Sequence, residues 1–253
     1  MDLQRSRILY FLGLVTFAII NILAINNYAY DNNGNVQCDN YVLNTYLYVI
    51  LGFIIMATVI LVDERFSVFT SMITNYGFFA FFGMLAVMIG LTILLMTTTN
   101  QLLSHMYWII VLIVLGLVLS VSVQVYGHMD MNNVYIAFII TIIVTAVMGF
   151  IGFKYGKSFI TYDFDKYLLW ALIALVIGSF IGIFLNVPNL MLYLSIAGVI
   201  IFSLLLVSYN NKLRENAKTC VTPLYPKESF GLIIKIGNLL QDIMYLVARA
   251  RRR

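Results

Sequence analysis

Residues 106–125 read MYWIIVLIVLGLVLSVSVQV, a stretch of twenty residues without a formal charge. An α-helix needs about twenty apolar residues to cross the hydrocarbon core of a bilayer. Further segments of the same character lie at 8–25, 42–62, 76–96, 134–153, 167–186, 190–208 and 230–248. The sequence therefore predicts an all-α membrane protein, organised as a single polytopic membrane domain over residues 1–253.

The composition supports this class. Of the 253 residues, 62% are hydrophobic and only 10% are charged, whereas an ordinary soluble domain has about 25% charged residues. Between Arg65 and Lys154 the only formal charge is Asp130. The net charge of +4 is not a nucleic-acid signature, because the basic residues gather at segment ends. We expect the lipid bilayer as a partner and no nucleic acid.

The first apolar segment has two interpretations. Arg5 and Arg7 precede an apolar run that ends at Ala24, which is also the arrangement of a secretory signal peptide. The run over 8–25 is long for a signal peptide, and further spans follow it. A span that is retained in the protein is therefore favoured over a cleaved signal.

The basic residues also bear on the number of crossings. If all eight segments cross, seven Lys and Arg residues fall on each side, a tie that the positive-inside rule disfavours. If 230–248 is embedded without crossing fully, the split becomes eleven to three, and 154–166 and 209–229 lie in the cytosol. The sequence thus predicts a bundle of seven transmembrane helices plus an eighth, membrane-embedded C-terminal helix.

The two cysteines depend on the same orientation. Six predicted crossings separate Cys38 from Cys220, so both lie on one side of the membrane. In the favoured orientation that side is the reducing cytosol, and both residues are expected to be free thiols. A disulfide is the alternative if the orientation is reversed.

Tyrosine and tryptophan gather near the segment ends, as expected for aromatic belts at the two membrane interfaces. The residues concerned are Tyr46, Tyr48, Tyr107, Trp108, Tyr135, Tyr167 and Trp170.

No catalytic motif accompanies the spans. The sequence has no Walker loop, dinucleotide fingerprint, GxSxG or paired catalytic carboxylates, and His105 and His128 lack the spacing of a zinc site. We therefore expect no enzyme activity, no cofactor and no tightly bound metal. Gly178 and Gly182 form a GxxxG spacing, which is typical of close helix packing.

The last apolar segment, GLIIKIGNLLQDIMYLVA (231–248), carries a polar stripe. Lys235, Asn238 and Asp242 are spaced i, i+3 and i+7, so they lie on one helical face. A carboxylate at membrane depth is costly and rarely present without a use. The stripe indicates a helix face turned toward the bundle interior or a water-filled cavity. The alternative is an amphipathic helix on the membrane surface, anchored by the basic tail.

Two further polar clusters lie near segment ends. Asp163 and Asp165 precede the segment 167–186, where acidic residues favour the N-terminal dipole of a helix. The cluster SYNNK, from Ser208 to Lys212, ends the segment before the last. This cluster is interpreted as a helix terminus that meets the interface.

Over about residues 106–250, four motifs resemble the Bax-inhibitor family, in the family's order. The first is VYIAFIITIIVTAVMGFIGFKYGKSFITYDFDKYLLWAL, similar to an Ala-Phe…Thr span, a basic loop and an Asp-Phe-Ser motif. Here that motif reads Asp163-Phe164-Asp165. The second is GIFLNVPN, similar to the family's Asn-Ile-Phe ending.

The other two motifs lie in the last two apolar segments. IAGVIIFSLLLVSYNNKL resembles the family's Gly-x-x-x-Phe-Ser…Tyr-Asp-Thr-Gln segment, and Tyr209 matches its tyrosine. GNLLQDIM resembles Asn-Leu-Tyr-Leu-Asp-Phe-Ile, and Asn238 and Asp242 match. The family's first aspartate is replaced by Asn210.

The resemblance implies a bundle of six or seven spans around a central last helix. It also implies a pH-sensitive calcium leak and protection against cell death. The membrane would be of the endoplasmic-reticulum or Golgi type in a eukaryotic or viral setting, and the plasma membrane in a bacterial one. Membrane proteins of cell-death pathways would be partners.

In the family, two aspartates from the last two helices share the site that opens or closes the pore. This chain keeps only the second, because Asn210 replaces the first. We therefore expect calcium to pass along Asp242, Asn210, Asn238 and Lys235, with a weak dependence on pH. The alternative is a non-conducting membrane protein that acts through partner proteins.

Overall fold

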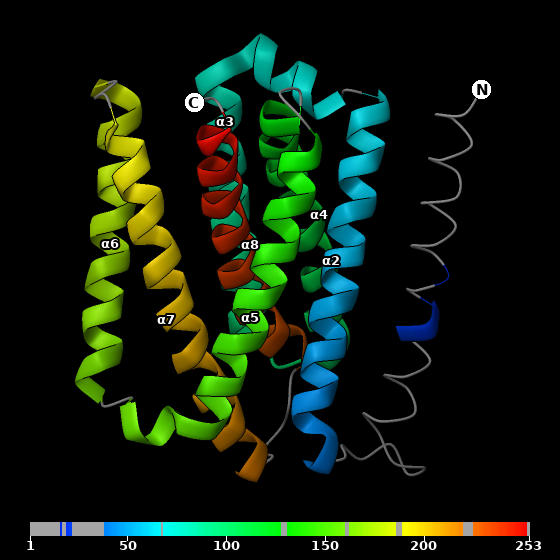
Figure 1. Cartoon of the computed structure of the whole chain (residues 1–253). Helices are drawn as coiled ribbons and strands as arrows, with labels where there is room; N and C mark the ends of the chain where they lie inside the picture. The colour runs from blue at the N-terminus through cyan, green and yellow to red at the C-terminus, as the bar shows by residue number, and fades with distance from the viewer. Residues whose placement is uncertain are drawn as a thin grey trace. The chain divides into compact units, whose positions relative to one another are not determined.

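The computed structural model in Figure 1 describes residues 16, 19–21, 38–66, 68–127, 131–159, 162–185, 189–219 and 225–251. Over these ranges the secondary structure is helical and no strand occurs. A 3₁₀ helix, η1 (Cys38–Asn40), precedes α2 (Tyr41–Phe66), α3 (Val68–Thr97), α4 (Gln101–Gly127), α5 (Met131–Phe159), α6 (Tyr162–Leu185), α7 (Leu190–Thr219) and α8 (Tyr225–Ala250).

The helices match the predicted spans from 42–62 onward, one helix to each span. Six of them are long and apolar enough to cross a membrane, whereas the apolar stretch found in α3 is the shorter Phe82–Thr97. The all-α membrane class is thereby supported. The count of seven crossings plus an embedded eighth helix stays a prediction, and most of the predicted segment 8–25 lies outside the described residues.

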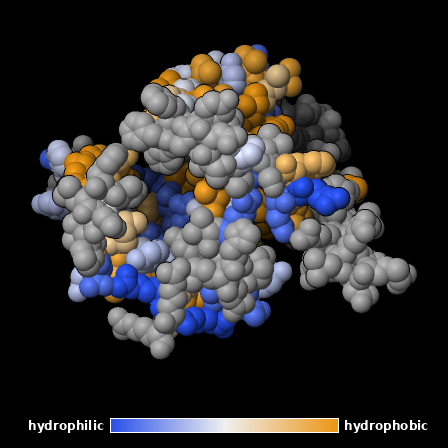
Figure 2. All heavy atoms as spheres, turned by 90° about the horizontal axis from the view of Figure 1, so that it is seen from above, coloured by the Kyte–Doolittle hydropathy of each residue, from blue (hydrophilic) through white to orange (hydrophobic). Residues whose placement is uncertain are grey.

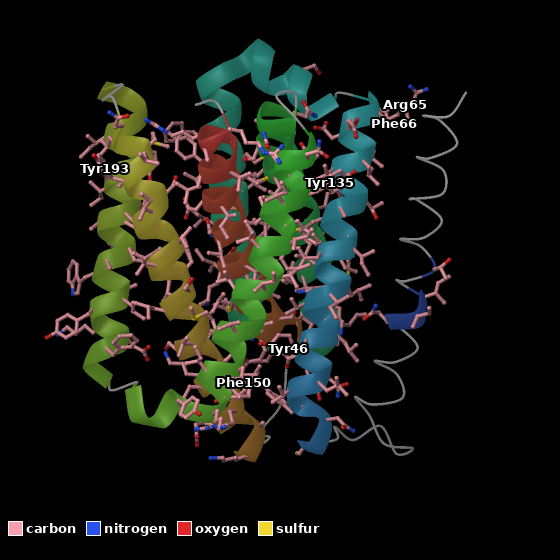
Figure 3. The ribbon with its side chains drawn as sticks, in the orientation of Figure 1. Tyr46, Arg65, Phe66, Tyr135, Phe150 and Tyr193 are labelled. Atoms are coloured by element: carbon pink, nitrogen blue, oxygen red, sulfur yellow. The ribbon has the colours of Figure 1, made fainter. Side chains whose placement is uncertain are left out.

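The apolar character of these helices is visible on their outer surfaces. Large hydrophobic side chains are exposed along α5, α6 and α7, and Figure 2 shows apolar atoms at the surface beside hydrophilic ones. Figure 3 shows Tyr193 of α7 and Phe150 of α5 among them, and their side chains are 66% and 59% exposed. Such surfaces suit contact with lipid tails.

Two buried threonine hydroxyl groups within the spans donate to carbonyl groups of their own helices. The Thr45 hydroxyl donates to the Tyr41 carbonyl at 2.9 Å, and the Thr141 hydroxyl donates to the Ala137 carbonyl at 2.7 Å. Because the bilayer core offers no water, this bond to the preceding turn lets a polar side chain remain in an apolar span.

The helices group into two compact units. Unit 1 comprises residues 1–123 and 217–233, and unit 2 comprises residues 124–216 and 234–253. Helices α4, α7 and α8 therefore each supply residues to both units.

Unit 1 is built around an aromatic cluster formed by α2, α4 and the first turn of α8. Tyr48 stacks on Tyr225, with ring centroids 5.6 Å apart, and meets Trp108 edge-on at 5.5 Å. The Tyr48 hydroxyl and His105 Nε2 form a hydrogen bond of 2.8 Å. A β-carbon at Gly52 would lie 2.5 Å from Cδ1 of Ile233, so this glycine permits the close approach of α2 to α8.

The belt interpretation is therefore wrong for two of its aromatic residues. Tyr48 and Trp108 are buried in the core of unit 1 because they pack on each other and on Tyr225. By contrast, Tyr167 and Trp170 of α6 are 71% and 61% exposed, as expected for residues at a lipid interface.

The start of α8 is fixed to α3 by Lys227. Its ammonium group donates to the Met96 carbonyl at 3.0 Å and also to the Thr98 carbonyl, where α3 ends. The last carbonyls of a helix have no partner within the helix, and a cation there also complements the helix dipole. Lys227 therefore acts as a C-terminal cap for α3.

Unit 2 contains a close contact between the antiparallel helices α6 and α7. A β-carbon at Gly178 would lie 2.8 Å from Cδ2 of Leu194, and one at Gly182 would lie 3.1 Å from Sδ of Met191. The GxxxG spacing therefore brings two helices together, as predicted.

Cys38, in η1, takes part in a disulfide bond. The expectation that it is a free thiol is therefore wrong. The only other cysteine in the sequence, Cys220, lies outside the described residues. Because disulfides persist in oxidising compartments, this bond favours the reversed orientation that the sequence left open.

Candidate ion pathway along the last two helices

Within unit 2, α7 and residues 234–250 of α8 run antiparallel (Figure 1). Three side chains of α8, seven residues apart, each meet a different part of α7 or the residue that precedes it, Asn189. Arg249 donates to the Asn189 side-chain oxygen, Asp242 is hydrogen-bonded to Ser195, and the Lys235 ammonium lies over the Tyr209 ring. Residue numbers rise along α7 as they fall along α8, so these contacts fix the alignment of the two antiparallel helices.

Asp242 fits against α7 because a glycine lies opposite it. A β-carbon at Gly198 would lie only 2.1 Å from the Asp242 Oδ2 atom, closer than real β-carbons come to other atoms. The Ser195 hydroxyl, one turn earlier on the same face of α7, donates a hydrogen bond to the Asp242 carboxylate. Within one turn, α7 therefore supplies both the hydroxyl group that donates to the Asp242 carboxylate and the space that this carboxylate occupies.

Lys235 and Asn238, the other members of the predicted stripe, have different surroundings. The Lys235 Nζ atom lies 4.1 Å from the centroid of the Tyr209 ring, within the range of a cation–π interaction. The Asn238 side-chain amide donates to the Ile234 carbonyl at 2.8 Å. Lys235 and Asp242 therefore face α7, whereas the Asn238 amide group is bonded to its own helix.

The structure does not bring Asn210 and Asp242 together. The Asn210 amide donates to the Leu206 carbonyl at 2.8 Å, and its Cβ atom faces Gly152 of α5. Twelve residues of α7 separate Asn210 from Gly198, which corresponds to about 18 Å along a helix. The pairing inferred from the resemblance is thus not observed, and Asn210 lies instead at the level of Lys235.

Ser195 and Gly198 are the site residues that the sequence analysis missed. Gly198 was noticed only as the first residue of the Gly-x-x-x-Phe-Ser resemblance. The sequence did contain a signal for this contact face of α7, because Ser195 and Gly198 are three residues apart and so lie on one side of the helix. What the sequence did not contain was the register that places this face opposite Asp242.

Asp165, the third residue of the Asp-Phe-Asp motif, joins α6 to α7. Its carboxylate accepts from the Ser208 hydroxyl and lies 2.8 Å from the Lys212 ammonium. The SYNNK cluster is therefore inside α7, which continues to Thr219, and its interpretation as a helix terminus is wrong. Phe164 is half-buried in α6, and the Asp163 side chain lies outside the description.

A further buried carboxylate, Asp63, lies in unit 1 near the end of α2. It is 3% exposed and accepts a hydrogen bond of 2.7 Å from the Ser120 hydroxyl of α4. The predicted span 42–62 ends one residue before Asp63, so the apolar pattern of the sequence does not single out this residue. Figure 3 shows Arg65 and Phe66 at the same end of α2, and Tyr46 toward the opposite end.

The acidic side chains do not gather into a metal centre in the part of the chain that is described. No group of three or more His, Cys, Asp or Glu residues there could hold a metal ion. The oxygen atoms of Asp242 and Ser195 supply only part of the six to eight oxygen ligands that Ca²⁺ takes. Such a pair can attract a cation that retains much of its hydration.

These features define a class: a multispanning helical membrane protein whose last helix carries a carboxylate against the preceding helix. Residues 38–252 match the family model described as "Inhibitor of apoptosis-promoting Bax1". The chain therefore belongs to the Bax-inhibitor family, and the predicted resemblance is confirmed. The match extends well before residue 106, where the predicted resemblance began, and leaves the segment 8–25 outside. No curated protein matches the chain.

Proposed function

We propose that this protein provides a slow leak of calcium ions across the membrane in which it resides and thereby modulates cell death. That membrane is of the endoplasmic-reticulum or Golgi type in a eukaryotic or viral setting, and the plasma membrane in a bacterial one. The observation that carries the proposal is the Asp242 carboxylate, held by Ser195 in the space left by Gly198. The description of the matching family model, which names inhibition of an apoptosis-promoting protein, supports the second part. The proposed role is non-enzymatic and needs no cofactor.

The physical argument begins with the cost of the site. An aspartate in the middle of a spanning helix costs about 2.5–3.5 kcal/mol on insertion scales, so its presence calls for a compensating function. Ca²⁺ binds oxygen ligands, among which carboxylates are the principal side-chain donors. Conduction also requires binding that is weak enough for the ion to leave. Two protein oxygen atoms can attract the ion and still release it.

Calcium flux into liposomes tests the proposal. The full-length chain is reconstituted with a calcium indicator inside the vesicles, and Asp242→Asn is compared with the wild type. We expect the substitution to lower the flux about tenfold, because the divalent ion loses its attraction to a unit charge. The amide keeps the volume of the side chain, so the packing against Gly198 is preserved.

Asp165→Asn is the matched control. It makes the same chemical change at a carboxylate that is paired with Lys212, so we expect a flux close to that of the wild type. An Asp242→Asn protein that conducts like the wild type would remove Asp242 from the pathway.

A second candidate function is a non-conducting interaction protein. The observation in its favour is Asn210, an amide bonded to its own helix at the position where the family resemblance expects an acid. Under this alternative, neither the wild type nor the variants would conduct calcium. Cell-death modulation would then depend on binding to other membrane proteins, which co-purification from membranes would detect.

A further inference from the structure

Lys235 is a basic residue on the face of α8 that packs on α7. It lies between Ile234 and Ile236 in an apolar helix, and its side chain is half-buried. The face of the Tyr209 ring, 4.1 Å from Nζ, provides an electrostatic attraction for the ammonium group. The ammonium is therefore held against α7 rather than extended along the helix to the membrane surface.

The position of this charge relative to Asp242 matters for any ion on the same face. Seven residues separate the two side chains, which is two helical turns or about 10.5 Å along α8. Both side chains contact α7, through Tyr209 and Ser195 respectively. A cation that moves along this face from one to the other approaches a fixed ammonium group.

Coulomb repulsion from that group discriminates by charge. A divalent ion is repelled twice as strongly as a monovalent ion at the same distance. The partners of the two side chains on α7, Tyr209 and Ser195, lie fourteen residues apart, or about 21 Å along that helix, so the ammonium lies farther from Asp242 than the rise along α8 alone. At about 15 Å and an effective dielectric constant of about 20, the difference corresponds to a selectivity factor of about sixfold against the divalent ion. Burial keeps this interaction from being screened as fully as it would be in bulk solution.

We propose that Lys235, held by Tyr209, is a tethered cation that restricts divalent relative to monovalent ions on the path past Asp242. The proposal rests on the leak proposed above and names the residue that sets its rate and selectivity. It explains why a basic residue is present on the same stripe as the carboxylate that attracts calcium.

The test measures calcium and sodium fluxes for the full chain in liposomes of one lipid composition. Lys235→Met removes the charge while keeping a long, flexible side chain, and Lys235→Arg keeps the charge as the matched control. We expect Lys235→Met to raise the ratio of calcium to sodium flux about sixfold and Lys235→Arg to leave it near the wild-type value. Tyr209→Leu, which removes the ring, should raise the ratio less than Lys235→Met.

The possible outcomes separate this inference from the proposed function. Wild-type flux with an unchanged ratio in Lys235→Met overturns the role of Lys235 and leaves the leak intact. Flux that is absent from the wild type but present in Lys235→Met supports the tethered cation, because its removal then opens the path. If no variant conducts either ion, both the leak and the role of Lys235 are refuted. Lys235→Gln serves as the second charge-removing variant if the methionine protein does not fold.

Discussion

Replacing Gly198 by alanine should disturb the candidate site without changing its chemistry. The new β-carbon would lie 2.1 Å from Oδ2 and 2.7 Å from Cγ of Asp242. Real β-carbons essentially never come within 3.0 Å of such atoms, so the Asp242 carboxylate must retreat by about 1 Å. The hydrogen bond from Ser195 to Asp242 is then stretched or broken.

The expected cost follows from three contributions. Overpacking of this size costs about 1–3 kcal/mol, and loss of a hydrogen bond to a charged group costs about 1.5–3 kcal/mol. The better helix propensity of alanine offsets about 1 kcal/mol. We therefore expect Gly198→Ala to lower the free energy of unfolding by about 1.5–5 kcal/mol.

Unfolding in mixed detergent micelles, followed by circular dichroism, provides the measurement. The same substitution is made in an Asp242→Ala background, where the shortened side chain leaves room for the β-carbon. There, we expect most of the penalty to disappear, which gives a coupling energy of at least about 1 kcal/mol between the two positions. An equal penalty in both backgrounds would refute the contact between Gly198 and Asp242.

Three further predictions concern the rest of the chain. Gly237→Ala should raise the free energy of unfolding by about 1 kcal/mol, because nothing lies within 4 Å of a β-carbon built at this position. A loss of stability would show that α8 needs a glycine there. Lys227→Met should lower the free energy of unfolding by about 1 kcal/mol, because it removes the cap on α3. Lys227→Arg should retain most of the stability in the same unfolding measurement. Cys38 should resist alkylation by a maleimide until a reductant is added, as mass spectrometry of the intact chain would show; labelling without reductant would contradict the disulfide.

The helices were predictable because each needs only a run of apolar residues of the right length. The residues at which the helices end were less predictable. The SYNNK cluster suggested that α7 stops near Ser208, since polar residues usually mark the membrane boundary. The residues that follow the cluster, LRENAK, include Leu, Arg, Glu, Ala and Lys, which are good helix formers, and the helix continues to Thr219.

Contacts between helices were much harder to predict. A helix that is apolar on every side gives no periodic signal to distinguish the face that packs on protein from the face that meets lipid. Tyr48 and Trp108 were therefore assigned to the interface, although they are buried. The α8 stripe was an exception, because its polar residues marked a face, and two of them, Lys235 and Asp242, do contact α7.

The partner of Asp242 was missed for a related reason. A family resemblance aligns residues along the chain, but the register between two antiparallel helices depends on which side chains fit together. Gly198 alone leaves room for the Asp242 carboxylate, and that fit appears only when both helices are placed.

The seven-residue spacing of Lys235, Asp242 and Arg249 limits how α8 can move against α7. A slide by one helical turn, about 5.4 Å, would separate all three from Tyr209, Ser195 and Asn189 together, so small longitudinal slips are penalised cooperatively. Rotation about the helix axis would likewise move all three away from their partners at once, because they lie on one face of α8, whereas tilting can break one contact at a time.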